Sequence, residues 1–127
     1  MRKKKIFQQT WLYATLVIVA LVVAVTVYNQ SNREPGALDD FARCLKDSGA
    51  NFYGASWCSH CQDQKEMFGQ SVRYIPYVEC STPNGGVNAI CKRANITGYP
   101  TWVFADSSQL SGTQSLETLA EKTGCSL

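Results

Sequence analysis

The feature that most constrains this chain is an apolar segment near its N-terminus. No charged residue occurs from Ile6 to Asn32, and Trp11–Tyr28 is almost entirely apolar, with aromatic residues near both ends. A helix of that length spans the hydrocarbon core of a bilayer, which is about 30 Å thick, and aromatic rings suit the headgroup regions. The segment therefore predicts a single transmembrane helix and leaves enough chain for one small folded domain.

A cluster of basic residues, Arg2–Lys5, lies just before this segment. Because positive charge is retained on the cytoplasmic side, we expect a single-pass membrane protein with a cytoplasmic N-terminus and an extracytoplasmic C-terminal domain. A cleavable signal peptide is an alternative, but it would have a shorter apolar core and a small-residue cleavage site, which Ala24–Asn29 does not offer. A buried core helix of this kind is expected only in a much larger protein.

We expect three parts: a basic stub with a transmembrane anchor at residues 1–30, a polar linker at 31–37, and a folded domain at 38–127. Four of the 12 basic residues precede the apolar segment, so the chain beyond it has eight basic and 10 acidic side chains. This leaves no basic surface to neutralise phosphates, and we therefore expect no nucleic-acid partner.

The folded domain alternates between helical and strand patterns. Helical spacing of apolar residues covers 38–45, 58–68, 87–94 and 116–120, and strand patterns cover 51–56, 74–80, 101–105 and 109–112. Pro76 would place its strand at a sheet edge or a bulge. The order of the elements predicts an α/β, thioredoxin-like fold, in which a central mixed sheet is flanked by helices.

A pair of cysteines, Cys58 and Cys61, stands between a predicted strand and a predicted helix. Free N–H groups and the helix dipole at such a position stabilise a thiolate, which is the form that attacks a disulfide. We therefore predict Cys58 as the nucleophile and Cys61, one turn later, as the thiol that resolves the mixed disulfide. His60, between them, would tune the pair by adding a positive charge.

The pair has two other interpretations, half of a zinc site and a purely structural disulfide. A structural zinc site needs a second pair of ligands, yet His60 is the only histidine, and Cys80 and Cys91 lie eleven positions apart. A disulfide across so short a loop would constrain the unfolded chain little. We therefore expect a redox-active disulfide without a metal or another cofactor.

A second motif, Gly98-Tyr99-Pro100-Thr101, precedes the strand pattern at 101–105. We predict a cis bond before Pro100. It would bring the backbone of Tyr99 close to the reactive sulfurs, where it can pair with an extended substrate. The alternative is an ordinary trans proline at the start of a strand.

These motifs belong to a wider pattern of four stretches. The stretches are Phe52–Lys65, Phe68-Gly69, Tyr77–Cys80 and Gly98–Trp102. The pattern resembles the thioredoxin-like domain of bacterial homologues of vitamin K epoxide reductase, over about residues 38–124. The resemblance implies a thioredoxin fold, a cis Pro100, a redox pair at Cys58 and Cys61, and a role in oxidative protein folding.

In that family the domain is often fused to, or partnered with, a four-helix membrane enzyme that passes electrons to quinone. The resemblance thus implies such an enzyme as a partner, since this chain has only one predicted anchor. Ser59 stands where the family usually has a proline. Thioredoxin itself has a buried acid at the position of Phe52, so the base for Cys61 is unassigned. Glu79 is one candidate, and a solvated strand residue is the other interpretation of Glu79.

The remaining four cysteines are expected to form structural disulfides. Cys80 follows a strand pattern and Cys91 lies on the next helical pattern, so a bridge would close the loop between them and add about 2–3 kcal/mol. A Cys44–Cys125 bridge would join the first and last helices of the domain and add about 4–5 kcal/mol. Six cysteines allow about 15 pairings, and in the alternative interpretation Cys80 and Cys91 form a second exchange pair.

Together these features predict a membrane-anchored, extracytoplasmic thiol–disulfide oxidoreductase. It would oxidise cysteines of exported proteins through the Cys58–Cys61 disulfide and be reoxidised by a membrane enzyme of the vitamin K epoxide reductase type. The alternatives are a disulfide reductase or isomerase supplied by a membrane donor, a copper carrier that uses the two cysteines as soft ligands, and a redox-inactive adaptor.

Overall fold

The computed structural model of the chain describes residues 2–31 and 35–127, with side chains described for residues 11–30 and 35–127. Contacts divide the chain into two compact units, residues 1–34 and 35–127. The second of these is the C-terminal unit. The finer division into an anchor and a linker stays a prediction.

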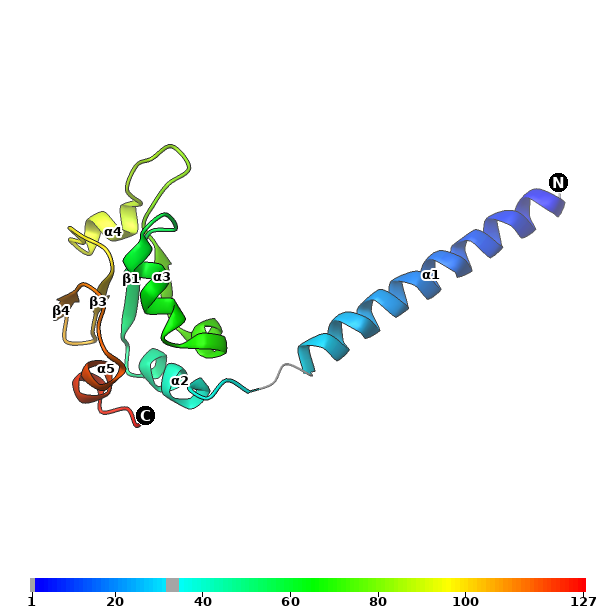
Figure 1. Cartoon of the computed structure of the whole chain (residues 1–127). Helices are drawn as coiled ribbons and strands as arrows, with labels where there is room; N and C mark the ends of the chain where they lie inside the picture. Colours follow the sequence, from blue (N-terminus) through cyan, green and yellow to red (C-terminus); the bar gives the residue numbers. More distant parts are fainter. Residues whose placement is uncertain (1, 32–34) are drawn as a thin grey trace. The chain divides into compact units, whose positions relative to one another are not determined.

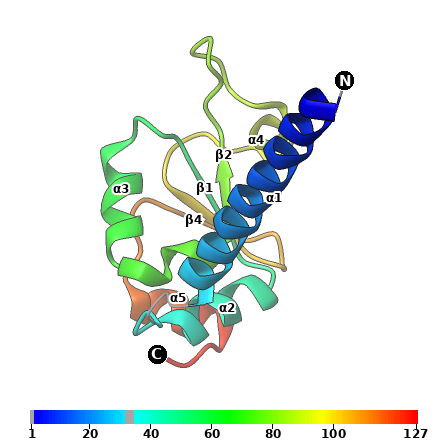
Figure 2. The ribbon, with the colours of Figure 1, turned by 90° about the vertical axis from the view of Figure 1, so that its right-hand side faces the viewer.

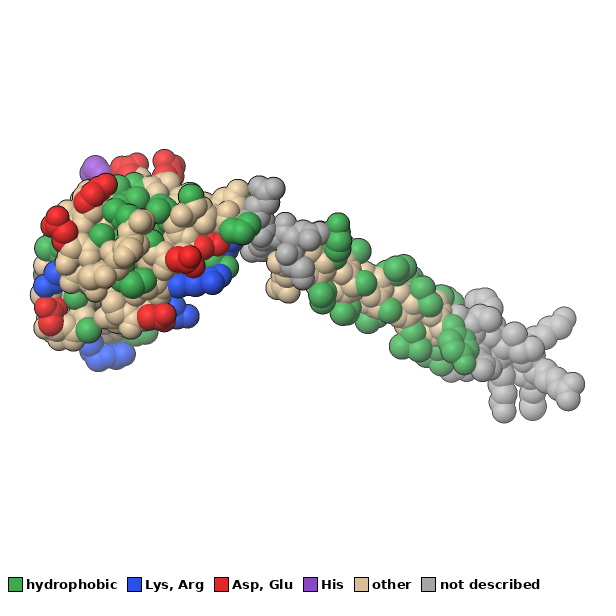
Figure 3. Space-filling model, turned by 90° about the horizontal axis from the view of Figure 1, so that it is seen from below, with side chains coloured by type: hydrophobic (Ala, Val, Ile, Leu, Met, Phe, Trp, Pro, Cys, Tyr) green, Lys and Arg blue, Asp and Glu red, His purple; other side chains and the backbone are tan. Residues whose placement is uncertain are grey.

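The first unit contains one long helix, α1 (Arg2–Ser31). Its stretch Trp11–Gln30 has 20 residues and a mean hydropathy of 2.3, so the helix is long and apolar enough to cross a membrane. The large apolar side chains of this stretch are exposed, and the coloured part of the helix in Figure 3 has no acidic or basic side chains. A helix that is apolar on all sides is typical of a membrane span.

The C-terminal unit is built on a four-stranded sheet with the strand order β2-β1-β3-β4. β1 is parallel to β2 and antiparallel to β3, which pairs antiparallel with β4. The strands are β1 (Asn51–Gly54), β2 (Tyr77–Glu79), β3 (Thr101–Val103) and β4 (Gln109–Ser111). This mixed sheet flanked by helices confirms the predicted α/β, thioredoxin-like class, and β2 is an edge strand, as Pro76 indicated.

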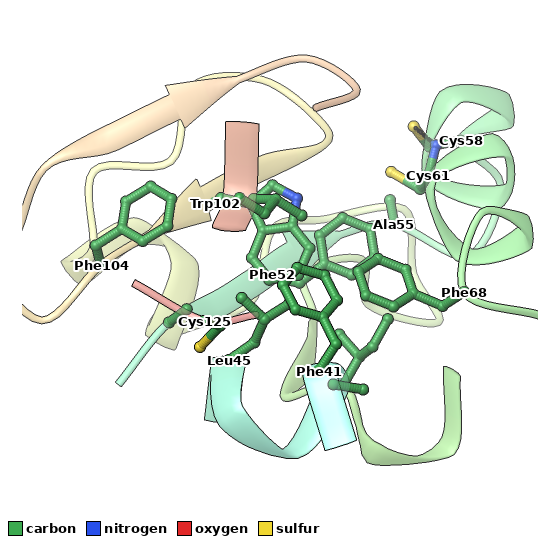
Figure 4. Packing of buried hydrophobic residues seen from close by; sticks show 14 residues of the cluster. Phe41, Leu45, Phe52, Ala55, Cys58, Cys61, Phe68, Trp102, Phe104 and Cys125 are labelled. Carbon is green, nitrogen blue, oxygen red and sulfur yellow. Dashed lines mark hydrogen bonds between the residues drawn. The ribbon is translucent and has the colours of Figure 1, made fainter. Parts of the chain in front are cut away.

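One face of the sheet carries the main core. Phe52 and Trp102 lie there with ring centroids 5.0 Å apart, and buried residues of three helices belong to the same cluster, among them Phe41, Leu45 and Leu119. The three helices are α2 (Asp39–Asp47), α3 (Ser59–Glu66) and α5 (Leu116–Thr123). Figure 4 shows this packing, with the cysteine end of α3 beside the aromatic rings.

The opposite face has a smaller core around Cys80, Cys91 and Ile96, against which Tyr53 and Val78 pack. Cys91 belongs to α4 (Ala89–Arg93). In Figure 1, α3 and α4 lie on opposite sides of β1. The segment that joins β2 to α4 projects beyond the end of the sheet in both ribbon views (Figures 1 and 2).

Two helix ends follow the local signals that the sequence contains. The Ser115 hydroxyl accepts the Thr118 N–H at 3.1 Å and caps α5, which ends at Gly124 with a φ of +74°. α2 is followed by Gly49, whose φ is +80°. A positive φ is strained for residues with a Cβ atom, so glycine is favoured at both positions.

The helix predicted at 87–94 is shorter than expected. The Asn88 side chain accepts the Ile90 N–H at 3.1 Å and caps α4, so the helix begins after Val87. Val87 and Ile90 are exposed, and of the predicted apolar face only Cys91 is buried. The helical spacing predicted the helix but does not define a buried face at Val87 and Ile90.

The strand predicted at 74–80 is also shorter, because a 3-10 helix, η1 (Gly69–Tyr74), occupies the segment before it. This element has no apolar periodicity and was not predicted. Pro76 lies outside β2, although its carbonyl accepts the Phe52 N–H at 2.9 Å. In the register of the sheet Tyr77 lies opposite Phe52, and the Tyr77 N–H itself donates to the Ile75 carbonyl at 2.9 Å.

Candidate functional site

The cysteine pair lies where β1 leads into α3. Cys58 is the N-cap residue of α3, and its Sγ accepts the backbone N–H of Cys61 at 3.2 Å. The Cys58 N–H donates to the Ala55 carbonyl at 3.1 Å, which holds the turn between strand and helix. Both thiols are free in this structure. One helical N–H therefore already points at the sulfur of the predicted nucleophile, where it favours negative charge.

The two sulfurs differ in their access to solvent. Cys58 is 8% exposed, whereas Cys61 is completely buried and belongs to the main core. Figure 4 shows both side chains at the same end of α3, above Ala55. Trp57, directly before the pair, is 72% exposed. Both cysteines are buried, but Cys58 keeps a small exposed fraction and Cys61 has none, a difference that fits the predicted roles of nucleophile and resolving thiol.

Cys61 lies in surroundings that disfavour its ionised form. Burial raises the pKa of the Cys61 thiol to about 12, and hydrogen bonding to the Cys58 side chain acts in the same direction. The positive charge of Lys65 opposes this effect. At neutral pH Cys61 is therefore a thiol, which becomes a nucleophile only after losing its proton.

The second motif lies next to the pair. The Tyr99–Pro100 bond is cis, and Tyr99 packs against the cluster that contains Cys58 and Cys61. The Tyr99 ring meets the Trp57 ring edge-on, with centroids 6.0 Å apart. The substrate contact predicted for the Tyr99 backbone stays a prediction.

His60 lies on the outer side of α3. Its side chain is 73% exposed, and its Nδ1 lies 3.4 Å from a carboxylate oxygen of Asp63. A positive charge on His60 would thus face a nearby negative charge in solvent, where such pairs are weak. Its tuning of the cysteine pair stays a prediction.

Glu79 is held as an ionised carboxylate by four hydrogen bonds. It accepts from Tyr77 Oη at 2.7 Å, from the Ser56 N–H at 3.1 Å, and from the N–H and hydroxyl of Ser81. Burial opposes ionisation, but these hydrogen bonds outweigh it and lower the pKa of Glu79 to about 2. A carboxylate this acidic is a poor proton acceptor for Cys61. Glu79 instead ties the turn before Cys58 to the end of β2.

Two residues near Cys61 were not singled out by the sequence patterns. Lys65 lies on α3, and its Nζ is 3.6 Å from the centroid of the Tyr77 ring on β2. The i, i+4 spacing from Cys61 to Lys65 could have indicated the lysine, because such residues share a helix face. Tyr77 comes from a neighbouring strand, so no local signal marks it.

The other four cysteines form two disulfides, Cys44–Cys125 and Cys80–Cys91, which are the pairings expected from their placement. Their sequence separations are 81 and 11 residues. Cys80 and Cys91 are completely buried, which favours a structural role over a second exchange pair.

Sulfur ligands for a soft metal are few in this chain. Cys58 and Cys61 are its free cysteines. Among the side chains that the structure describes, no three His, Cys, Asp or Glu residues gather into a group that could hold a metal ion. A copper ion at the pair would therefore have these two cysteine sulfurs as ligands.

The chain is similar to the thiol-disulfide oxidoreductase LTO1 of Arabidopsis thaliana, with 48% identity over 92 residues. The similarity covers 68% of this chain and 24% of the plant protein, so the chain spans about a quarter of the length of this curated relative. No family model matches the chain. The name of the relative describes the same chemistry that the geometry of Cys58 and Cys61 indicates.

Proposed function

We propose that this chain is a thiol–disulfide oxidoreductase, anchored in a membrane by α1 and active on the extracytoplasmic side. The observation that carries the proposal is the pair at the N-terminus of α3, in which Cys58 is slightly exposed and Cys61 is completely buried. The similarity to a plant thiol-disulfide oxidoreductase supports the same chemistry. The family proposed is the thioredoxin-like domain of bacterial vitamin K epoxide reductase homologues.

In the proposed oxidation, a substrate thiolate attacks the Cys58 sulfur of the Cys58–Cys61 disulfide, and Cys61 leaves as a thiolate that takes up a proton. A second substrate thiolate then attacks the substrate sulfur of the mixed disulfide and releases Cys58. Two electrons have passed from the substrate to the pair, and the substrate holds a new disulfide. The electrons pass between sulfur atoms, so these steps need no metal or nucleotide.

The proposed substrates are exported proteins with cysteines, and the proposed oxidant of the reduced pair is a membrane enzyme of the vitamin K epoxide reductase type. The length and apolar character of α1 support a membrane location, where such an enzyme would be near. Reoxidation would begin when Cys58 attacks a disulfide of that enzyme, and Cys61 would then displace the enzyme from Cys58.

A trapping experiment tests the proposal. In the Cys61→Ala variant of the full chain, mixed disulfides with substrates and with the membrane oxidant should persist on Cys58. They should run as high-mass species on non-reducing gels and disappear with reductant. The Cys58→Ala/Cys61→Ala variant is the matched control. A trap that forms no adducts dependent on Cys58 would contradict disulfide exchange.

The direction of electron flow is tested by the reduction potential of the Cys58–Cys61 pair. An oxidant of exported proteins should have a potential well above that of thioredoxin, which is about −270 mV. A value close to that of thioredoxin would instead favour a reductase. Stoichiometric copper on the reduced full chain after loading would favour a carrier.

A further inference from the structure

A half-buried lysine lies beside the buried sulfur of the pair. Lys65 follows Cys61 by four residues on α3, so the two side chains share one face of the helix. The Lys65 ammonium lies over the Tyr77 ring, with Nζ 3.6 Å from the ring centroid. That geometry is a cation–π contact, which fixes an otherwise flexible side chain.

The same ring is held close to the Cys61 sulfur by the sheet. A Cβ atom added to Gly54 on β1 would lie 2.9 Å from Tyr77 Cε2 and 3.1 Å from Cys61 Sγ. Since both distances start from one point, Cε2 and Sγ are no more than 6.0 Å apart. The Tyr77 hydroxyl donates to Glu79 at 2.7 Å, which holds the ring in this place.

The charged and titratable groups around Cys61 come from several elements. They are Cys58 and Lys65 at α3, Tyr77 and Glu79 on β2, and Tyr99 before β3. Of these groups Lys65 is the cation, and its charge favours the Cys61 thiolate. The three ion pairs found within residues 35–127 use other side chains, so no carboxylate oxygen of that region lies within 4.0 Å of the Lys65 ammonium.

We propose that Lys65, held on the Tyr77 ring, is a positioning residue that supplies the positive charge for the Cys61 thiolate in both directions of disulfide exchange. When a substrate thiolate attacks Cys58, Cys61 leaves with the electron pair of the broken S–S bond. When the pair is reoxidised, Cys61 loses its proton to solvent and attacks Cys58, and the thiol bound to Cys58 leaves as a thiolate. Cys61 is an anion in both steps, and this inference rests on the proposed function.

Loss of the Lys65 charge should slow the attack of Cys61 on Cys58 only moderately, because the loss has two opposing consequences. Without Lys65 a smaller fraction of Cys61 is ionised at a given pH, but each thiolate is a stronger nucleophile. With a Brønsted coefficient of about 0.5, a tenfold loss of thiolate slows the attack only about threefold. We expect the resolution step to slow by about three- to tenfold in Lys65→Gln.

The step can be measured directly with glutathione disulfide as the probe. The reduced full chain is mixed with it, samples are quenched in acid, and intact mass spectrometry follows the glutathione adduct on Cys58 from pH 7 to pH 9. The adduct should persist about three- to tenfold longer in Lys65→Gln than in the wild type. Lys65→Arg, which keeps the charge, should restore the wild-type lifetime.

Two further variants separate the charge from structure. Tyr77→Leu removes the ring and should lengthen the lifetime as Lys65→Gln does, whereas Tyr77→Phe keeps the ring but loses its hydrogen bond to Glu79 and should lengthen the lifetime less. Lys92→Gln, on the exposed side of α4, is the matched control and should match the wild type. Equal lifetimes in Lys65→Gln and wild type over this pH range would overturn the role of Lys65. If the wild type forms no Cys58 adduct at all, the proposed function fails with it.

Discussion

The two kinds of cysteine site in this molecule differ in where their sulfurs lie. Cys58 caps a helix and is 8% exposed, and its partner is three residues away, one turn into the same helix. Cys80 and Cys91 are completely buried and join the end of β2 to α4. All these residues are cysteines, so residue type does not distinguish them. Exposure to solvent and position at a helix N-terminus decide which cysteines can exchange disulfides.

The largest effect expected from this comparison concerns Cys58. Cys58→Ala should lower the rate of oxidation of a dithiol peptide by more than about a thousandfold, because the attacking sulfur is lost. The double variant Cys80→Ala/Cys91→Ala should stay within about threefold of the wild type in the same assay, provided that it is folded. A loss of comparable size in the double variant would show that this buried pair takes part in exchange.

The next effect concerns stability, where a structural disulfide should matter more than the Cys58–Cys61 pair. Replacing Cys44 and Cys125 by alanine should lower the free energy of unfolding by up to about 4–5 kcal/mol, because their bridge closes most of the C-terminal unit. Replacing Cys58 and Cys61 should cost far less, since the loop that they close is short. Urea unfolding of the oxidised full chain in detergent measures both. A larger loss from the Cys58/Cys61 variant would contradict this division of roles.

A third prediction concerns the hydrogen bonds that hold α3, the helix that carries Cys58 and Cys61. The buried amide of Gln64 accepts from the Trp102 indole N–H at 3.2 Å and the Gln114 N–H at 2.7 Å, and donates to the Gln114 carbonyl at 3.0 Å. Gln64→Leu would leave these groups unpaired and should cost about 2–4 kcal/mol in urea unfolding. Gln62→Leu, on the exposed side of α3, should change stability by less than about 1 kcal/mol. Similar losses in both variants would contradict the network.

The smallest effect concerns Glu79. Through Ser56 and Ser81 it links the turn before Cys58 to the segment that follows Cys80. Its pKa is lowered from 4.5 to about 2, so its stabilising contribution is present above pH 4.5 and is lost as the pH falls toward 2. Glu79→Gln should therefore lower the free energy of unfolding at pH 7 by about 1–2 kcal/mol. The difference from the wild type should shrink below pH 4. A difference that is constant from pH 7 to pH 3 would contradict this role.

Local signals predicted much of the fold. The apolar segment of α1, the Ser115 and Gly124 caps of α5, and the strand patterns of β3 and β4 all depend on residues close in sequence. The cysteine pair was found for the same reason, since its spacing and its place before a helix are local. The 3-10 helix η1 was missed because it has no apolar periodicity, and the helix predicted at 87–94 was too long because its N-cap lies at Asn88.

The surroundings of the pair depend on register and could not be predicted. The parallel pairing of β1 with β2 places Tyr77 opposite Phe52 and Glu79 opposite Gly54, and this alignment brings the ring to Cys61. The hydrogen bonds to Glu79 need donors from two separate loops, at Ser56 and Ser81. The sequence offered Glu79 as a base, but its low pKa follows from hydrogen bonds that only the folded chain brings together.

The central claim is that Cys58 and Cys61 open and close while the other four cysteines stay joined. It is tested most directly by equilibrating the full chain in glutathione buffers from about −120 to about −300 mV and alkylating free thiols. Mass spectrometry then identifies each labelled cysteine. We predict that Cys58 and Cys61 become labelled together within this range and that the other four remain unlabelled. Labelling of Cys80 and Cys91 at the same potential, or no change at Cys58, would contradict the account.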